Sequence, residues 1–221
     1  MEIRNYIDHT LLKPTATRAD IEKLCQEAKE HGFYAVCVNS VYAEAAAGFL
    51  AGSGVRLAVV CGFPLGAMIT AAKVREAELA CAAGAAEIDM VMDIGALLGG
   101  DEEKCRTDMQ AVVEAAKAYD AIVKVIIEIS QLTDSQIVKA CELACAAGAA
   151  YVKTSSGFTG HGATEEAVRL MRASCPPEVQ VKASGGIRDL DAALRMIRAG
   201  ASRIGTSSGI AIIKEAAERG L

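Results

Sequence analysis

The sequence of 221 residues lacks a hydrophobic run long enough to cross a bilayer. Its longest uncharged stretch, residues 57–72, is interrupted by Gly62, Pro64 and Gly66, and it is shorter than the roughly 20 apolar residues that a spanning helix needs. The first ten residues contain no basic region followed by an apolar run, so we expect no signal peptide. The sequence therefore predicts a soluble, cytoplasmic chain that makes no membrane contact.

Neither sign of charge predominates. The chain carries 23 Lys and Arg against 28 Asp and Glu, a net charge of −5, and the two kinds are interleaved. This balance argues against a broad surface for nucleic acid or anionic membrane, although a small anionic substrate needs only a local positive site. Hydrophobic residues make up 52% of the chain and charged residues 23%, so we expect a folded globular protein.

The sequence also lacks a recognisable set of metal ligands. Its three histidines, His9, His31 and His161, are scattered along the chain. Cys141 and Cys145 are spaced by one helical turn, but no histidine or second cysteine pair accompanies them. The eight cysteines lie in apolar segments or a loop, which indicates reduced core thiols. We expect no metal and no cofactor.

What the sequence does contain is a repeated phrase. Residues 81–89 (CAAGAAEID) and 145–153 (CAAGAAYVK) are two copies of one unit, and residues 29–37 and 197–205 are looser copies. Each copy has a helical end, then a glycine suited to the left-handed conformation, then a short β-prone run. Four such copies along the chain predict repeated βα units.

The remaining apolar runs complete eight expected strands, at residues 5–10, 33–38, 56–61, 86–92, 122–128, 150–155, 179–184 and 202–206. Amphipathic stretches between them predict helices at 19–30, 71–83, 103–118, 134–147, 164–173 and 190–199, and a further helix is expected at 210–219. We interpret residues 1–221 as a single α/β domain, a (β/α)8 TIM barrel. An open, doubly wound sheet remains the alternative, because periodicity alone does not prove closure.

Alternation along these strands predicts a charged barrel interior. Branched and sulfur-containing side chains such as Ile88, Met90 and Val152 suit the outer face, which leaves their neighbours pointing inward. The residues expected inside are Asp8, Asp89, Lys124, Glu128, Lys153 and Lys182. A structural ion-pair network, or a register slip that sends one lysine to solvent, is the alternative explanation.

Two lysines near the carboxyl ends of neighbouring strands, with an aspartate across the barrel, suit imine chemistry. An amine attacks a carbonyl only as the free base, and an unperturbed lysine has a pKa of about 10.4. A second ammonium about 4 Å away, at an effective dielectric near 20, adds roughly 4 kcal/mol of repulsion, which corresponds to about 3 pKa units. Lys182 could therefore make Lys153 substantially neutral, while an Asp–Lys pair relays protons.

Two glycine- and serine-rich segments follow the last two expected strands, at residues 183–188 and 205–209. Glycines let backbone N–H groups approach an oxyanion, and a helix N-terminus favours negative charge. Loops after strands 7 and 8 are the usual phosphate position in this fold. We expect a phosphate site there, although each segment alone would also suit a tight turn or a helix cap.

The motifs together resemble those of the deoxyribose-phosphate aldolase family. The matching segments are Tyr6–Pro14, Cys61–Gly66, Glu87–Met92, Val125–Glu128, Val152–Phe158 and Val181–Arg188. The resemblance implies a metal-independent (class I) lyase that cleaves 2-deoxy-D-ribose 5-phosphate reversibly into D-glyceraldehyde 3-phosphate and acetaldehyde. It also implies a homo-oligomer, a dimer or a tetramer, that acts on small phosphosugars and aldehydes in carbohydrate degradation.

The resemblance assigns roles to individual residues. Lys153 matches the Schiff-base lysine, and Asp89 and Lys182 match a proton-transfer pair. Supporting positions are Asp8, Thr10 and Cys37, and the phosphate and substrate contacts are Gly157, Gly185, Gly186, Arg188, Gly205, Ser207 and Ser208. The chain departs from the family pattern at Asp93, Leu98 and Met68, and we expect Asp93 to add negative charge near the mouth of the site.

Two other functions fit part of this pattern. Another phosphosugar barrel, such as an isomerase or epimerase, would need an acid–base pair or a metal but no amine nucleophile. A catalytically silent sugar-phosphate-binding protein would keep the phosphate segments and lose one of Lys153, Lys182 or Asp89. All three residues are present, which favours the aldolase.

Overall fold

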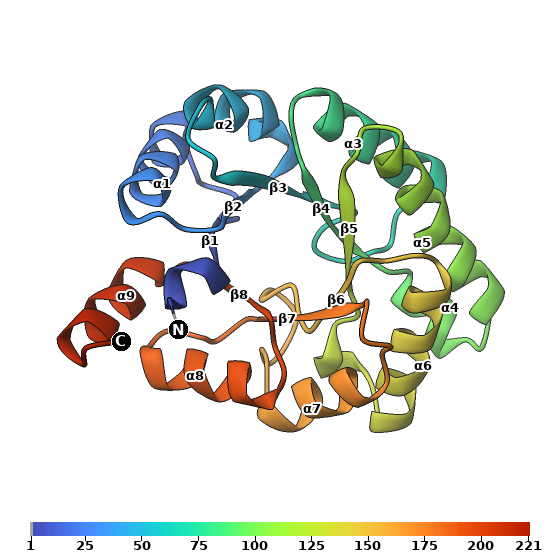
Figure 1. The fold of residues 1–221 in the computed structure, drawn as a ribbon. Coiled ribbons are helices and arrows are strands. Elements are labelled where there is room, and N and C mark those ends of the chain that lie inside the picture. The colour runs from blue at the N-terminus through green and yellow to red at the C-terminus, as the bar shows by residue number, and fades with distance from the viewer. Residues whose placement is uncertain (1) are drawn as a thin grey trace.

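Eight parallel strands close into a barrel in the computed structural model, which describes residues 2–221 (Figure 1). Each strand pairs with the next along the chain, and β8 returns to β1 through the register Ile7↔Ile204. The strands are β1 Ile7–Leu11, β2 Ala35–Val38, β3 Arg56–Cys61, β4 Glu87–Val91, β5 Ile122–Ile126, β6 Tyr151–Lys153, β7 Gln180–Ser184 and β8 Arg203–Thr206. The predicted (β/α)8 barrel is confirmed, and the open sheet is excluded.

Helices form a ring around the barrel (Figure 1). They are α1 Arg18–His31, α2 Ala43–Leu50, α3 Thr70–Ala82, α4 Ile94–Leu98, α5 Glu102–Lys117, α6 Asp134–Ala146, α7 Glu165–Ala173, α8 Leu190–Ala199 and α9 Gly209–Glu218. Seven of these match predicted helices, whereas α2 and α4 were not predicted. Both are short and nearly free of charge, so they lack the polar face from which a surface helix is recognised.

Local sequence explains where the helices begin and end. Thr17 and Thr133 each form a reciprocal capping box at the start of α1 and α6, which satisfies backbone N–H groups that have no partner within the helix. The glycine of each repeated phrase has a positive φ: 65° at Gly32, 109° at Gly84, 85° at Gly148 and 117° at Gly200. This confirms the left-handed turn that the repeat predicted before each strand.

The barrel wall lies between two apolar cores, one shared with the helices outside it and one inside it. Their outward side chains, including Ile88, Met90 and Val152, pack with the helices in the main hydrophobic core. A much smaller apolar group lies on the inward face, where Cys37, Ala58 and Val60 pack together with neighbouring residues. The predicted alternation is therefore correct, and most of the remaining interior is left to charged side chains.

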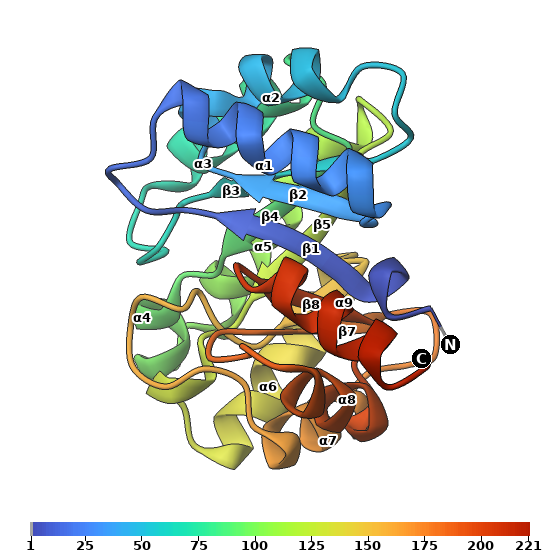
Figure 2. The ribbon, with the colours of Figure 1, turned by 90° about the vertical axis from the view of Figure 1, so that its left-hand side faces the viewer.

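The two ends of the barrel differ in what they carry. Figure 2 shows both termini at one end, with the arrow of β1 pointing toward the opposite end. Because all eight strands are parallel, the carboxyl end of every strand, with the loop that follows it, lies at the end away from the termini. Active sites of this fold lie on that face.

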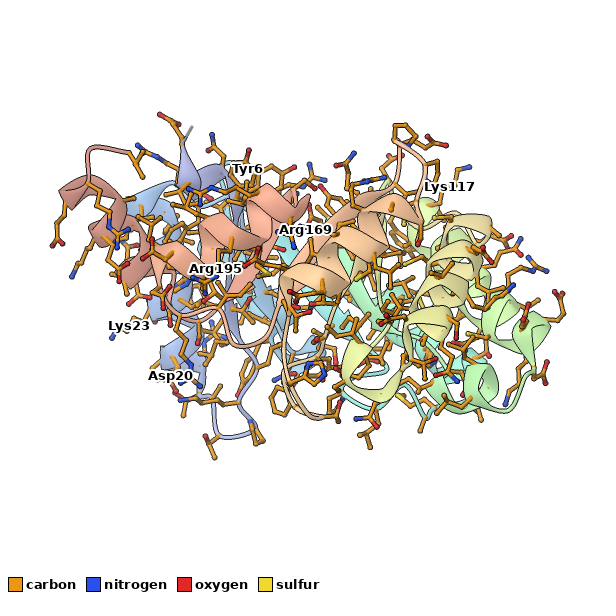
Figure 3. The ribbon with its side chains drawn as sticks, turned by 90° about the horizontal axis from the view of Figure 1, so that it is seen from below. Tyr6, Asp20, Lys23, Lys117, Arg169 and Arg195 are labelled. Carbon is orange, nitrogen blue, oxygen red and sulfur yellow. The ribbon has the colours of Figure 1, made fainter. Side chains whose placement is uncertain are left out.

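The outer face of the helix layer carries paired charges. Arg169 of α7 and Arg195 of α8 lie beside each other in Figure 3, and both contact Glu165, at 2.7 and 3.4 Å. Within residues 2–221, no helix is long and apolar enough to span a membrane.

Candidate active site

Three lysines meet at one carboxylate inside the barrel. Asp89 Oδ2 accepts hydrogen bonds from Lys153 Nζ at 2.7 Å and Lys182 Nζ at 2.8 Å, and Asp89 Oδ1 accepts one from Lys124 Nζ at 2.7 Å. The four residues come from β4, β5, β6 and β7. Strand alternation alone predicted all four inside, and the structure brings them into direct contact.

Below this group lies a second set of charges. Asp8 of β1 accepts hydrogen bonds from Lys182 and, at 2.9 Å, from Arg203 of β8. Glu87 of β4 contacts Lys124 at 2.5 Å and Arg203 at 3.2 Å. Sequence reasoning missed Arg203, although it stands two residues before Gly205 on the same strand and therefore shares its inward face.

A cavity of about 280 Å³ opens above the lysines at the carboxyl end of the barrel. Lys153 is the member of the lysine–aspartate group that lines it, whereas Asp89 and Lys182 lie beneath and are fully buried. Several predicted site residues share the lining: Thr10, Gly157, Gly185, Gly186, Arg188, Gly205 and Ser207. Lys13 also lines the cavity and was not predicted, because its exposed loop position gave no pattern.

Burial and the neighbouring charges separate the two lysines electrostatically. Burial, with the Lys182 ammonium as a further cause, lowers the pKa of Lys153 despite the attraction of Asp89. Burial also opposes the charged form of Lys182, but Asp8 and Asp89 together raise its pKa. Burial would raise the pKa of Asp89 as well, yet the three lysines hold it well below its usual range. We expected Lys182 to be the main influence on Lys153, and burial is the larger one.

The predicted supporting residues surround this group. Thr10 Oγ1 donates to the backbone carbonyl of Asp8 at 2.8 Å. Cys37 is fully buried with its Sγ 3.9 Å from Asp89 Oδ2. Burial first, and the Asp89 carboxylate second, raise the pKa of the Cys37 thiol to about 11. The thiol is therefore neutral near pH 7 and is a poor nucleophile.

The glycine-rich segments form one wall of the cavity. Gly185 and Gly186 have φ values of 87° and 78°, and a side chain on Gly185 would come within 2.8 Å of Gly162 Cα. Helix α9 begins directly after β8, and its N-cap, Ser208, makes no side-chain cap hydrogen bond. The backbone N–H of Ser208 donates to Thr206 Oγ1 at 2.9 Å, and Ser208 does not line the cavity, whereas Ser207 does.

Glu128 is buried as predicted but does not join the lysines. Its two carboxylate oxygens accept the backbone N–H of Ser156 at 3.3 and 3.1 Å. Glu128 itself has a φ of 57°, which is rare for a residue with a long side chain. It therefore ties the end of β5 to the segment that follows Lys153.

Asp93 lies outside the cavity lining, and a lysine pairs with its charge. Asp93 Oδ1 caps α4 by accepting the backbone N–H of Ala96 at 2.9 Å, and Asp93 Oδ2 pairs with Lys104 at 3.1 Å. Strand β4 ends at Val91, so alternation no longer sets the direction of this side chain. Leu98 and Met68 are exposed and also lie outside the cavity lining.

The geometry is that of a (β/α)8 barrel with a lysine-lined cavity at the carboxyl end of its strands, the arrangement typical of enzymes of this fold. The family model of the DeoC/LacD family aldolases matches residues 3–215. The chain belongs to this family, and it is an aldolase and hence a lyase.

Known proteins similar to the chain cover nearly all of it. A deoxyribose-phosphate aldolase of Brevibacillus brevis is 52% identical over 220 residues, which cover 100% of this chain and 99% of the relative. One of Thermococcus kodakarensis is 55% identical over 217 residues and covers 97% of both chains. The tetrameric deoxyribose phosphate aldolase of Aeropyrum pernix superposes with a TM-score of 0.91 at 35% identity, covering 99% of this chain and 92% of that one.

Proposed function

We propose that the protein cleaves 2-deoxy-D-ribose 5-phosphate reversibly into D-glyceraldehyde 3-phosphate and acetaldehyde through a Schiff base on Lys153. One observation carries the choice of nucleophile. Of the three lysines on Asp89, Lys153 is the one that lines the cavity, and its pKa is lowered. A lysine amine must be both accessible and uncharged to attack a carbonyl.

Attack by Lys153 Nζ on the aldehyde carbon of the open-chain sugar gives a carbinolamine, and loss of water gives the protonated imine. The imine withdraws electrons, so the bond between the second and third carbons breaks when the third-carbon hydroxyl loses its proton. Glyceraldehyde 3-phosphate leaves, and the enamine that remains is protonated at its terminal carbon. Water then releases acetaldehyde and restores Lys153.

These steps require a group that gives and takes protons beside Lys153. The ammonium of Lys182 is a proton source held 2.8 Å from Asp89 Oδ2, and the same oxygen lies 2.7 Å from Lys153 Nζ. Neither Lys182 nor Asp89 lines the cavity, so this pair exchanges protons with the reacting atoms at Lys153 Nζ, which Asp89 Oδ2 contacts. Asp8 and Thr10 hold this pair in position from β1.

The phosphate of the sugar binds at the glycine-rich wall. Gly185, Gly186 and Gly205 line this wall, and Gly186 leaves open space where a side chain would stand, while Arg188 and Lys13 supply positive charge at the cavity. The start of α9, which lacks a side-chain cap, adds the favourable end of a helix dipole. The distance from this wall to Lys153 then sets where the aldehyde carbon of the bound sugar lies relative to the amine.

Three further properties belong to the same proposal. The reaction needs no metal, because the imine itself withdraws the electrons. The protein is a homo-oligomer, which the tetrameric assembly of the Aeropyrum pernix relative supports. It acts in the cytoplasm. Among residues 2–221, no group of three or more His, Cys, Asp or Glu side chains is placed to hold a metal.

Borohydride reduction in the presence of acetaldehyde tests the central step. Reduction converts the imine to a stable secondary amine, and peptide mass spectrometry locates it. The adduct is expected on the peptide that contains Lys153. An adduct on another lysine, or none with an active enzyme, would show that the assigned nucleophile is wrong.

A further inference from the structure

Two charged residues, Arg203 and Glu87, lie at the end of the barrel interior away from the cavity and take no part in the proposed reaction. Arg203 is buried, and its Nη1 donates to Asp8 Oδ1 at 2.9 Å and to Glu87 Oε2 at 3.2 Å. Its guanidinium carbon stands 3.6 Å from the ring centre of Tyr34 and 5.3 Å from that of Tyr151. Arg203 is therefore held in place by ion pairs and by aromatic faces.

Both residues connect to Lys153 through an unbroken series of contacts. Arg203 binds Asp8, which accepts from Lys182, which donates to Asp89 Oδ2 beside Lys153. Glu87 contacts Lys124 at 2.5 Å, and Lys124 donates to Asp89 Oδ1 at 2.7 Å. Because these groups are buried, solvent and salt screen their charges far less than at the surface.

The groups that face this interior come from nearly every strand: Asp8, Tyr34, Cys37, Arg56, Glu87, Asp89, Lys124, Tyr151, Lys153, Lys182 and Arg203, with Glu128 just beyond β5. Strand β3 contributes Arg56 at its start and then the apolar residues Ala58 and Val60. Arg56 pairs with Glu87 from the exposed end, with 40% of its side chain accessible. Glu128 binds a backbone N–H and makes no salt bridge within residues 2–221.

The buried charges balance in one protonation state of Lys153. With Lys153 charged, the series of buried ion pairs around Asp89 holds four cations, Lys124, Lys153, Lys182 and Arg203, against three carboxylates, Asp8, Glu87 and Asp89. Glu128 lies outside this series because it binds a backbone N–H, and Arg56 is left out because solvent screens its partly exposed side chain. Loss of the Lys153 proton leaves three of each. A buried charge without compensation is costly, so the charges below the reaction centre favour the free amine.

We propose that Arg203 and Glu87 are positioning residues that set the protonation of Lys153 from the far end of the barrel, with opposite effects. Arg203 favours the free amine, and Glu87 favours the ammonium. The inference rests on the proposed function, because it concerns Lys153 as nucleophile. Neither residue reaches the cavity, so both act through Asp8, Lys124, Lys182 and Asp89.

The test is the rate of acetaldehyde trapping on Lys153 as a function of pH in Arg203→Gln and Glu87→Gln. Trapping rises with pH as the amine loses its proton, and the midpoint of this rise is measured by peptide mass spectrometry. Arg203→Gln is expected to move the midpoint to higher pH, and Glu87→Gln to lower pH, each on the order of one pH unit.

Two further variants separate charge from structure. Arg203→Lys keeps the charge, so its midpoint should stay near that of the unmodified enzyme even if its melting temperature falls. The double variant Glu87→Gln/Arg203→Gln removes one charge of each sign and should return the midpoint toward the starting value. Replacing both members of a buried pair is tolerated better than removing one. If Arg203→Gln does not fold, the difference in pH midpoint between the double variant and Glu87→Gln still gives the effect of Arg203.

Midpoints that stay fixed, or move in the same direction in both single variants, overturn the inference and leave a purely structural role. That result, with the adduct still on Lys153, leaves the proposed function intact. If the unmodified enzyme forms no adduct on Lys153, the proposed function fails and the inference fails with it.

Discussion

Lys153 and Lys182 donate to the same oxygen of Asp89, at 2.7 and 2.8 Å, yet only Lys153 lines the cavity. The shared oxygen places two amines within reach of one carboxylate. The pKa of Lys153 is lowered, whereas that of Lys182 is raised because Asp8 binds it as well. One lysine is thus suited to attack a carbonyl and the other to remain a proton donor.

The first prediction concerns pH. Because the pKa of Lys153 lies below the ordinary lysine value of 10.5, the free amine forms at lower pH than on an unperturbed lysine. Activity should therefore rise with pH along an acidic limb whose midpoint lies clearly below that value. Initial rates from a pH series, corrected for the stability of the enzyme, give the midpoint. A limb that continues to rise up to the ordinary lysine pKa would contradict the lowered value.

The second prediction uses Gly205, whose side-chain position faces Lys182. A Cβ at Gly205 would lie 3.1 Å from Lys182 Cε and 2.9 Å from Ser184 Cβ. Gly205→Ala should displace the lysine from Asp89 and lower kcat by about 10- to 100-fold, since a misplacement of about 1 Å can have this effect. Steady-state kinetics measure kcat, and the free energy of unfolding is followed in parallel.

Gly48→Ala on α2 is the matched control for this change. Nothing lies within 4 Å of the added Cβ, and alanine in a helix interior stabilises by up to about 1 kcal/mol relative to glycine. Its kcat should equal that of the unmodified enzyme. If Gly205→Ala also keeps full activity, the position of Lys182 matters less than proposed.

Phosphate recognition is the subject of the third prediction. Arg188→Ala should lower kcat/KM for 2-deoxyribose 5-phosphate by about 10- to 100-fold, the loss of one charged hydrogen bond. Unphosphorylated deoxyribose should be a much poorer substrate, and Arg188→Ala should leave kcat/KM for it unchanged. Arg195→Ala, on the outer helix face (Figure 3), is the control and should affect neither sugar. An equal loss for both sugars would place Arg188 outside phosphate recognition.

Chelation provides the fourth prediction. Activity should survive dialysis against a strong chelator, because the proposed imine replaces a metal as the electron sink. Rates before and after dialysis are compared at equal protein concentration. Loss of activity that zinc or another divalent ion restores would replace the mechanism with a metal-dependent one.

Much of the barrel was predictable because its signals are local and repeated. The glycine in each of the four related phrases marks one turn, and strict alternation in β4 and β5 assigns Asp89 and Lys124 to the interior. Alternation fails where a strand ends early, as at Asp93, because the backbone then turns and the side chain caps α4 instead. It also gave no information on α2, whose residues are apolar on most sides.

The connections within the site were less predictable than its members. Sequence position assigns Lys124, Lys153 and Lys182 to one interior, but which carboxylate each contacts depends on the stagger of the strands around the closed barrel. The register Lys153↔Lys182 between β6 and β7 is set by hydrogen bonds that no local pattern reveals. Arg203 was missed for a related reason: a single arginine in a short strand is expected at the surface unless partners are known.

The last prediction separates the two lysines. Lys153→Leu removes the nucleophile, so neither activity nor a reduced acetaldehyde adduct should remain. Lys182→Leu keeps the nucleophile but removes the adjacent positive charge and the proton donor. The pKa of Lys153 should then rise by roughly 1–3 units, because repulsion is lost and Asp89 has fewer partners. Activity at pH 7 should fall by several orders of magnitude, since both the free-amine fraction and proton transfer suffer.

Adduct formation in Lys182→Leu should become measurable again at higher pH, where the remaining lysine loses its proton. Peptide mass spectrometry after borohydride reduction, over a pH series in each variant, makes the comparison directly. An adduct on Lys182 in Lys153→Leu would reverse the two roles. If Lys182→Leu forms the adduct with an unchanged pH midpoint, Lys182 acts in proton transfer alone, and burial by itself sets the pKa of Lys153.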